Sequence, residues 1–365
     1  MVSKIFAVKQ AKNVFFKGRM MPVYINLYIT SRCNLKCRHC YFHESLNRPE
    51  EISLENIEKL SKSSGEIVNI ALTGGEPFLR QDIAKIAGLF VKNSNARIVT
   101  IPTNGMLSKV IEEQAGKMLR ENPKAIFNVF VSLDGEEKTH NRIRGDKNAF
   151  SNAMKTLSGL ENLRKKFDNL RLGIIFTMNE TNAEQALPLY KKISKNLGID
   201  QFQINFLRGS PKSIRVSDRI IGEYEKANAE IQKDFESGKY SGYKIMGDFY
   251  TCINRRYKEV LAKTVKEKKF QLPCYAGTTN IIIYPNADVF ACEMRDDLKF
   301  GNLGDYGFDL KKMTEEKKNK ELVEKIRKSN CFCTFECQLT SNVAYNPKEL
   351  LKAGSLFLKL KMGGK

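Results

Sequence analysis

Long apolar runs are absent from this 365-residue sequence. No window approaches the ~18 uninterrupted apolar residues that a membrane-spanning helix needs, so no membrane span is expected. The first 19 residues, MVSKIFAVKQAKNVFFKGR, contain no continuous apolar segment of the kind found in secretory signal peptides. Stretches rich in glycine and proline are also scarce, and 42% of the residues are hydrophobic, which argues against a disordered chain. These absences together predict a folded, cytoplasmic protein.

Positive charge is in excess along the chain, with a formal net charge of +20. Such a charge could serve to bind nucleic acid or an anionic membrane surface. The lysines are widely spread, however, and the densest stretch, residues 311–329, interleaves acidic residues as a solvated helix face does. The distribution therefore favours a solvated basic surface, and no DNA partner is expected. The C-terminal tail gives a stronger indication of a binding partner, because its LFLKLK segment alternates apolar and basic residues. Binding of an acidic partner, a lipid or RNA therefore stays open as the alternative.

Nine cysteines in a chain without an export signal predict thiolates kept reduced in a cytosol, where metal binding is favoured over disulfides. Three of them, Cys33, Cys37 and Cys40, are spaced C-x3-C-x2-C. Three thiolates this close together can ligate three irons of a [4Fe–4S] cube and leave the fourth iron open to a small molecule. A zinc knuckle with His43 as the fourth ligand is the alternative interpretation.

Strand-like and helix-like segments alternate between residue 23 and about residue 240. Helical spacing fills the stretches between the strands, and Ser53 is the expected N-cap of the first helix. Six repeats of strand and helix predict an α/β fold with a parallel sheet and right-handed crossovers, either doubly wound or curved into a barrel. The strand-like segments are apolar, β-branched or aromatic and span residues 23–30, 66–73, 96–103, 125–134, 171–178 and 201–208.

Unusual residues gather where these strands end. The three cysteines follow the first strand, GGEP (74–77) the second and Thr-Asn-Gly (103–105) the third, while SLDG (132–135) ends the fourth. Active sites of parallel α/β folds form at the carboxyl ends of the strands, so these residues predict a site at that edge. A zinc knuckle offers no reason for the coincidence. The last two strands end in further polar residues: Thr177, Asn179, Asn205 and Arg208.

This order of motifs resembles the radical S-adenosylmethionine (SAM) superfamily, in which an aromatic residue, here Tyr41, follows the cysteines. The resemblance implies a partial (β/α)6 TIM-type barrel and a [4Fe–4S] cluster held by Cys33, Cys37 and Cys40. SAM would bind the open iron through its amino and carboxylate groups, and its reductive cleavage would yield a 5′-deoxyadenosyl radical. An electron donor such as flavodoxin or ferredoxin is the implied partner.

The resemblance also implies a set of SAM contacts, and simple chemistry supports several of them. The glycine pair of GGEP lets the backbone approach a ligand, and Glu76 can accept hydrogen bonds from an ammonium group. Ser132 and Asp134 are two apart and would point to one side of an extended strand, while the fork of Arg144 suits a carboxylate. The implied contacts are Tyr41, Gly74, Gly75, Glu76, Asn104, Ser132, Asp134 and Arg144.

Ordinary structural roles compete with some of these assignments. N-G and D-G are common turn dipeptides, so a bare turn is the alternative for Asn104 and for SLDG. His140 is expected to be a structural histidine rather than a general base, and His39 is expected to point away from the cluster.

Six further cysteines lie beyond residue 250. Residues 274–292 predict a β-hairpin around a P-N-A-D turn, which would bring Cys274 and Cys292 near each other. This hairpin, the Lys/Glu-rich helix after it and the final CFCTFEC segment resemble the auxiliary-cluster domain of the SPASM/twitch subgroup, which implies a second [4Fe–4S] cluster. The favoured ligands are Cys274, Cys292, Cys333 and Cys337.

Alternatives stay open in this region as well. Cys331 could replace either late ligand, and a structural zinc ribbon could replace the cluster. Cys252 is expected to be a buried structural residue, because free cysteine behaves as a small hydrophobe.

The motifs divide the chain into an N-terminal extension (1–19), a core barrel (20–240), an auxiliary-cluster domain (241–340) and a basic C-terminal tail (341–365). The expected function is hydrogen abstraction from a small molecule such as a sugar, cofactor precursor or lipid head group. A peptide maturase that forms thioether or carbon–carbon crosslinks, or oxidises a side chain, is the alternative. It is less favoured because only about 20 residues precede the first strand. A non-enzymatic metal- or nucleic-acid-binding protein is the remote alternative.

Overall fold

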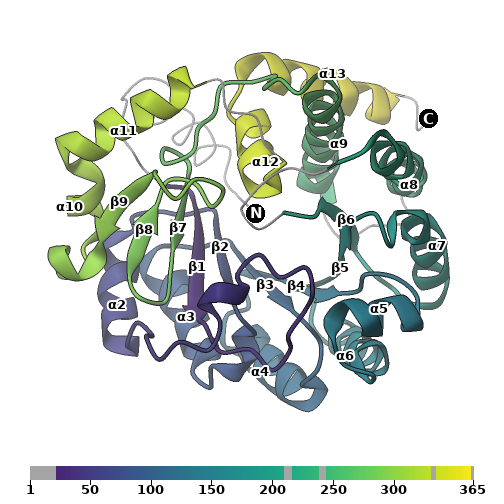
Figure 1. Ribbon diagram of the computed structural model, residues 1–365, viewed down its shortest axis with the longest axis horizontal. Helices are drawn as coiled ribbons and strands as arrows, with labels where there is room; N and C mark the ends of the chain where they lie inside the picture. The colour runs from purple at the N-terminus through teal and green to yellow at the C-terminus, as the bar shows by residue number, and fades with distance from the viewer. Residues whose placement is uncertain (1–21, 209–215, 238–243, 330–333, 363–365) are drawn as a thin grey trace.

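The computed structural model of the chain describes residues 22–208, 216–237, 244–329 and 334–362. Within these ranges the strands form one sheet in the order β6-β5-β4-β3-β2-β1-β7-β8-β9 (Figure 1). The strands are β1 (Tyr24–Thr30), β2 (Asn69–Gly74), β3 (Ile98–Thr103), β4 (Ile126–Ser132), β5 (Leu170–Met178), β6 (Gln201–Phe206), β7 (Asn280–Ile283), β8 (Asp288–Phe290) and β9 (Lys299–Asn302).

Helices alternate with the first six strands and surround the sheet (Figure 1). The first of them starts as predicted, because the side chain of Ser53 accepts a hydrogen bond from the backbone N–H of Asn56 (3.2 Å). The helices are α2 (Leu54–Ser63), α3 (Ile83–Asn93), α4 (Ser108–Glu121), α5 (Glu137–Arg144), α6 (Ala149–Arg164), α7 (Ala186–Asn196), α8 (Asp218–Glu236), α9 (Lys244–Glu267), α10 (Leu310–Glu315), α11 (Lys317–Lys328), α12 (Glu336–Ala344) and α13 (Pro347–Met362).

Strands β1 to β6 are all parallel to their neighbours, and each lies within one of the predicted strand segments or extends it by one residue. Their apolar character has a direct cause. In β1 every residue from Ile25 to Thr30 is buried, because helices cover one side of the sheet and the interior of the curved sheet lies on the other. The predicted α/β fold with six strand–helix repeats is confirmed.

The predicted hairpin is confirmed too, as the antiparallel pair β7–β8. The hairpin is not separate from the barrel sheet, because β7 pairs in parallel with β1 from Asn280 to Ile283. The sheet of the barrel therefore continues without a break into the hairpin and then into β9. This continuity places the residues around the hairpin beside the cysteine loop that follows β1.

Helices α9 and α12 lie across the open side of the curved sheet, between the edge formed by β6 and the side formed by β1 and β7 (Figure 1). Helix α9 packs against α8, α12 and α13, and α12 also contacts β7. The sequence analysis did not anticipate α9 as an element that closes the barrel. Cys252, predicted to be buried, is 1% exposed on this helix.

Among the helices within the described ranges, none combines the length and the apolar character that crossing a membrane would require.

Candidate active site

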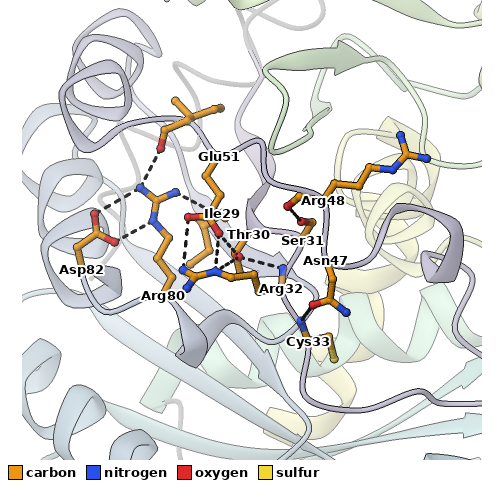
Figure 2. A network of polar contacts seen from close by, with 11 residues as sticks. Ile29, Thr30, Ser31, Arg32, Cys33, Asn47, Arg48, Glu51, Arg80 and Asp82 are labelled. Atoms are coloured by element: carbon orange, nitrogen blue, oxygen red, sulfur yellow. Dashed lines mark hydrogen bonds and ion pairs between the residues drawn. The ribbon is translucent and has the colours of Figure 1, made fainter.

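The loop after β1 carries the first three cysteines and is tied to the residues that lead into α2. The backbone N–H of Cys33 donates to Asn47 Oδ1 (2.9 Å), as Figure 2 shows. One residue earlier, Arg32 forms an ion pair with Glu51, with Nε and Oε1 2.9 Å apart. These contacts fix where the cysteine loop begins.

Arg80 anchors the same region through contacts with the backbone (Figure 2). Arg80 is 5% exposed, and its guanidinium donates to the carbonyl oxygens of Ile29 (2.6 Å) and Ile52 (2.8 Å). Asp82 neutralises the charge through an ion pair of 2.8 Å. A buried guanidinium with both of these partners holds the end of β1 firmly.

The GGEP segment lies directly against the cysteine loop. The N–H of Gly75 donates to Thr30 O (3.0 Å), and the N–H of Glu76 donates to Arg32 O (2.8 Å). A Cβ atom on Gly74 would lie 2.0 Å from Thr30 O, and Gly74 has a φ of +136°. On Gly75, a Cβ atom would lie 2.2 Å from Arg32 O. Both glycines are therefore required by the close packing of the two loops.

Glu76 is fully buried, and both of its carboxylate oxygens accept hydrogen bonds. Oε1 accepts from Thr103 Oγ1 (2.9 Å) and from the N–H of Phe78 (3.2 Å). Oε2 accepts from the N–H of Asn104 (2.7 Å). Burial raises the pKa of Glu76 to about 7. The carboxylate thus joins the end of β2 to the end of β3, and its contact with an ammonium group stays a prediction.

Arg144, at the end of α5, lies between Asp134 and the cysteine loop. Its Nη2 is 2.6 Å from Asp134 Oδ2, and its Nη1 is 3.7 Å from the sulfur of Cys37. Asp134 is fully buried and also accepts a hydrogen bond from the N–H of Thr177 (2.8 Å). Burial acts to raise the pKa of Asp134, but the charge of Arg144, the two nearby histidines and the N–H of Thr177 together lower that pKa. Asp134 thereby fixes the charge of Arg144 close to the thiols.

These elements enclose a cavity of about 310 Å³ at the carboxyl ends of the strands. The three thiols of the first motif share this cavity and are half-buried. In the described part of the chain, no three His, Cys, Asp or Glu side chains converge on a point as ligands of a single metal ion would. A group larger than one ion fits the shared cavity. The predicted site residues that border it are Cys33, Cys37, Cys40, Tyr41, Gly74, Gly75, Glu76, Asn104, Ser132, Arg144 and Cys337.

Ser132 borders the cavity but Asp134 does not, because β4 ends at Ser132 and the strand alternation stops there. His39 borders the cavity too, and its expected orientation away from the cluster stays a prediction. His140 is fully buried, and its Nδ1 accepts a hydrogen bond from the N–H of Asp134 (3.0 Å), which is the expected structural role.

Residues 27–193 match the family model described as the radical SAM superfamily. The chain contains a radical SAM domain. Over 181 residues the chain is 35% identical to the Fe-coproporphyrin III synthase of Methanosarcina barkeri. This alignment covers 48% of this chain and 41% of that protein. The chain is 24% identical over 290 residues to AlbA of Bacillus subtilis, a subtilosin biosynthesis protein, with 78% of this chain and 58% of AlbA covered. The chain thus spans about half the length of these curated relatives.

A solved structure, native anSMEcpe with bound AdoMet and Kp18Cys peptide, resembles the chain over almost its whole length. The TM-score is 0.62 at 19% identity, with 94% of this chain and 98% of that chain covered. At this identity the likeness shows the fold alone. That fold covers both the radical SAM domain and the region that follows it. Curated relatives such as AlbA, which matches 78% of the chain, support the predicted SPASM/twitch subgroup.

A buried ion cluster joins the radical SAM domain to the C-terminal region, and the sequence analysis missed it. Arg208 Nη1 is 2.5 Å from Glu293 Oε2, and Arg208 Nη2 is 2.6 Å from Glu336 Oε2. Glu293 directly follows Cys292, and Glu336 directly precedes Cys337. Acidic residues next to predicted metal-binding cysteines were the signal that could have revealed the cluster.

Aromatic rings complete this cluster at the border of the cavity. The guanidinium of Arg208 lies 5.3 Å from the ring centre of Tyr41 and 4.7 Å from that of Phe335. The hydroxyl groups of Tyr28 and Tyr41 both donate to the carboxylate of Glu293. Tyr41 directly follows Cys40, so one continuous set of contacts runs from the first cysteine motif to Cys292.

The second group of cysteines is described in part. The carbonyl oxygen of Cys337, in the first turn of α12, accepts a hydrogen bond from Asn280 Nδ2 at the start of β7 (3.1 Å). Cys292 follows two residues after Phe290, the last residue of β8, which pairs with Ile282 of β7. Both cysteines therefore approach the open end of the hairpin.

Cys274 reaches the same corner from the segment before β7. The N–H of the next residue, Tyr275, donates to Asn342 Oδ1 on α12 (2.9 Å). The predicted ligand Cys333 and its alternative Cys331 lie outside the described residues.

Proposed function

We propose that this chain is a radical SAM enzyme in which Cys33, Cys37 and Cys40 hold a [4Fe–4S] cluster. The observation that carries the proposal is that these three thiols, the guanidinium of Arg144 and the GGEP segment border one cavity. When bound, the cluster and SAM supply the reductive cleavage of SAM and the 5′-deoxyadenosyl radical that abstracts hydrogen from a substrate. Flavodoxin or ferredoxin is the proposed electron donor.

The residues around the cavity suit this role. Arg144 brings a fixed positive charge next to the thiolates and offers a donor to the carboxylate of SAM, because Asp134 holds it in place. The missing side chains of Gly74 and Gly75 let the GGEP segment pack directly against the cysteine loop, so that both border the cavity.

A second [4Fe–4S] cluster is proposed for the C-terminal region, with Cys274, Cys292, Cys333 and Cys337 as ligands and Cys331 as the alternative late ligand. The support for this is that the segments carrying the three described cysteines adjoin the hairpin or α12: Cys337 O accepts from Asn280, Cys292 follows β8, and the N–H of Tyr275, after Cys274, donates to Asn342. Cys337 also borders the cavity, so a group bound there would lie next to a substrate.

The proposed substrate is a small molecule, such as a sugar, a cofactor precursor or a lipid head group. The support for this is the named activity of the Methanosarcina relative, Fe-coproporphyrin III synthesis, which concerns a small molecule.

A peptide is the second candidate substrate, and one feature favours it. A groove of about 280 Å³ lies between the loop at residues 41–50 and the hairpin turn at residues 284–288, and Tyr41 and Phe42 border both this groove and the cavity. An extended chain lying in the groove could reach the cavity from there. AlbA and the peptide-bound neighbour are consistent with such a substrate.

The first test is to measure iron and sulfide per chain after anaerobic reconstitution, together with 5′-deoxyadenosine formed from SAM in the presence of dithionite. The wild type should bind about eight irons, and a variant with Cys33, Cys37 and Cys40 changed to Ala should bind about four and form no 5′-deoxyadenosine. Cys252→Ala is the matched control, since Cys252 belongs to neither group, and it should keep both properties. About four irons in the wild type and none in the triple variant would remove the second cluster from the proposal. Wild-type protein that forms no 5′-deoxyadenosine with its iron in place would contradict the enzyme assignment.

A further inference from the structure

A second, deeper cavity of about 110 Å³ continues the first towards the amino-terminal ends of the strands. It lies between the sheet and the residues of α9 and α12 that close the open side of the barrel. Because the two cavities share so much of their lining, a molecule bound beside the cysteines can extend into the deeper one. The residues that border both are Tyr24, Thr100, Phe130, Gln203, Glu336 and Cys337.

The deeper cavity contains buried polar atoms that the protein leaves unsatisfied. Among the described residues, neither the hydroxyl of Tyr257, which is 5% exposed, nor Oε1 of Glu336, which is 2% exposed, has a hydrogen-bond partner. Buried polar atoms are nearly always hydrogen-bonded, and each one left without a partner destabilises the fold. Both residues border the same small space, which indicates that it receives a polar group.

The charges around the two cavities show which kind of polar group this is. Arg144 is paired with Asp134, and Arg208 is paired with both Glu293 and Glu336. Lys258 borders the deeper cavity from α9, next to Tyr257, and within the described ranges it forms no ion pair. Burial lowers the pKa of Lys258 to about 8, whereas a neighbouring carboxylate would have raised it.

We propose that the deeper cavity binds an anionic end of the substrate, a carboxylate or a phosphate, through the ammonium group of Lys258 and the hydroxyl of Tyr257. Oε1 of Glu336 accepts a hydrogen bond from a hydroxyl or N–H group beside that anion. The reacting part of the substrate then lies in the larger cavity, next to Cys33, Cys37 and Cys40. This assignment rests on the proposed function only for what happens in the larger cavity, since binding of the anion needs no reaction.

The test measures how inorganic phosphate and succinate shift the midpoint of thermal unfolding of the reconstituted full-length chain, at constant ionic strength set with sodium chloride. At equal concentration, the ligand that binds the folded state more tightly raises the midpoint more, so the two anions show whether a phosphate or a carboxylate is preferred. Lys258→Gln should weaken binding of the preferred anion by about tenfold or more, because a charge-assisted hydrogen bond is lost. Lys258→Arg should retain most of the binding, and Tyr257→Phe should weaken it by less than Lys258→Gln does.

Lys263→Gln is the matched control, because Lys263 lies on the same helix with its side chain 59% exposed and paired only with Glu267. Equal shifts in the wild type and Lys258→Gln would show that the anions bind the basic surface, and would overturn the assignment. So would the absence of any shift in the wild type, which would leave water as the occupant of the cavity. A chain that forms 5′-deoxyadenosine but binds neither anion would refute this inference and leave the proposed function intact. A chain that binds the anion at Lys258 but does not cleave SAM would support this inference and contradict the proposed function.

Discussion

Arg208 and Glu293 form a buried ion pair, with Nη1 and Oε2 2.5 Å apart, that joins the end of β6 to the residue after Cys292. Glu336, the residue before Cys337, binds the other side of the same guanidinium. Two predicted ligands of the second metal site are thus positioned through one arginine of the barrel. Since Arg208 also covers the ring of Tyr41, next to Cys40, the two cysteine groups are mechanically connected.

Replacing Arg208 by Met should destabilise the chain by about 3–5 kcal/mol, because two buried carboxylates would lose their counter-ion. Unfolding in guanidinium chloride would measure the loss. Arg219→Met is the control, since Arg219 pairs with Glu180 and Glu184 at the surface and its loss should change the stability far less. We also expect Arg208→Met to retain the iron bound at Cys33, Cys37 and Cys40 better than the iron of the second site. Equal loss at both sites would contradict the specific role of Arg208 at the second site.

The close packing of GGEP on the cysteine loop leads to a prediction about glycine. Gly75→Ala should lower the free energy of unfolding by several kcal/mol, on the order of 3, since its Cβ atom would lie 2.2 Å from Arg32 O. The displaced loop should also bind less iron at Cys33. Gly88→Ala, in the interior of α3 where the nearest atom would be 3.8 Å away, should instead stabilise the chain by about 0.5–1 kcal/mol. Chemical denaturation and iron analysis of both variants check the pair, and a harmless Gly75→Ala would disprove the packing argument.

The contact between Asp134 and Arg144 leads to a prediction about SAM. Arg144→Gln should weaken SAM binding by about tenfold or more, as expected when a charge-assisted contact with a carboxylate is lost. Asp134→Asn should weaken it by a smaller factor, because Arg144 keeps its charge but loses the partner that orients it. Equilibrium dialysis of labelled SAM against the reconstituted protein measures both effects. Arg142→Gln is the control, because Arg142 is exposed and lies two residues before Arg144 on another face of α5. It should leave SAM affinity unchanged. An effect equal to that of Arg144→Gln would argue against a specific contact at Arg144.

The sequence was most informative where a local pattern dictates the structure. Buried parallel strands need apolar residues on both faces, so β1 to β6 could be located from composition and length. The parallel arrangement then placed the cysteine motif, GGEP and Asn104 at one edge, which the cavity confirms. Both predictions depend only on the local sequence around each strand and motif.

Contacts between distant parts of the chain could not be predicted in this way. Arg208 and its two glutamates are separated by 85 and 128 residues, so the acidic neighbours of Cys292 and Cys337 stand out in the sequence but nothing local identifies Arg208 as their partner. The position of Asp134 was misjudged because the strand alternation was extended beyond Ser132, where β4 ends. The role of α9 was missed because its amphipathic pattern does not say which opening it covers.

Lys258 should make the folded chain less stable at neutral pH than a variant without this charge. Its pKa is lowered by burial from the ordinary 10.5 to about 8, so the folded state holds the proton less tightly than the unfolded state does. The cost is present in full below pH 8, decreases as the folded state loses its proton between about pH 8 and pH 10.5, and vanishes above that range. The other groups at this cavity do not alter the sign, since Glu336 is paired with Arg208 and burial keeps the pKa of Tyr257 well above its usual value.

Lys258→Met should therefore raise the free energy of unfolding at pH 7 by about 2 kcal/mol, a value reduced from the full shift because the side chain is only half-buried. The difference between variant and wild type should shrink between pH 8 and pH 10, which urea unfolding at the two pH values would show. Lys263→Met, with an exposed side chain on the same helix, should show no such change. A Lys258→Met variant that is less stable than the wild type at pH 7 would mean that the ammonium group already has a stabilising partner. A stabilised variant would instead identify Lys258 as a residue kept at a cost to the fold, as binding residues commonly are.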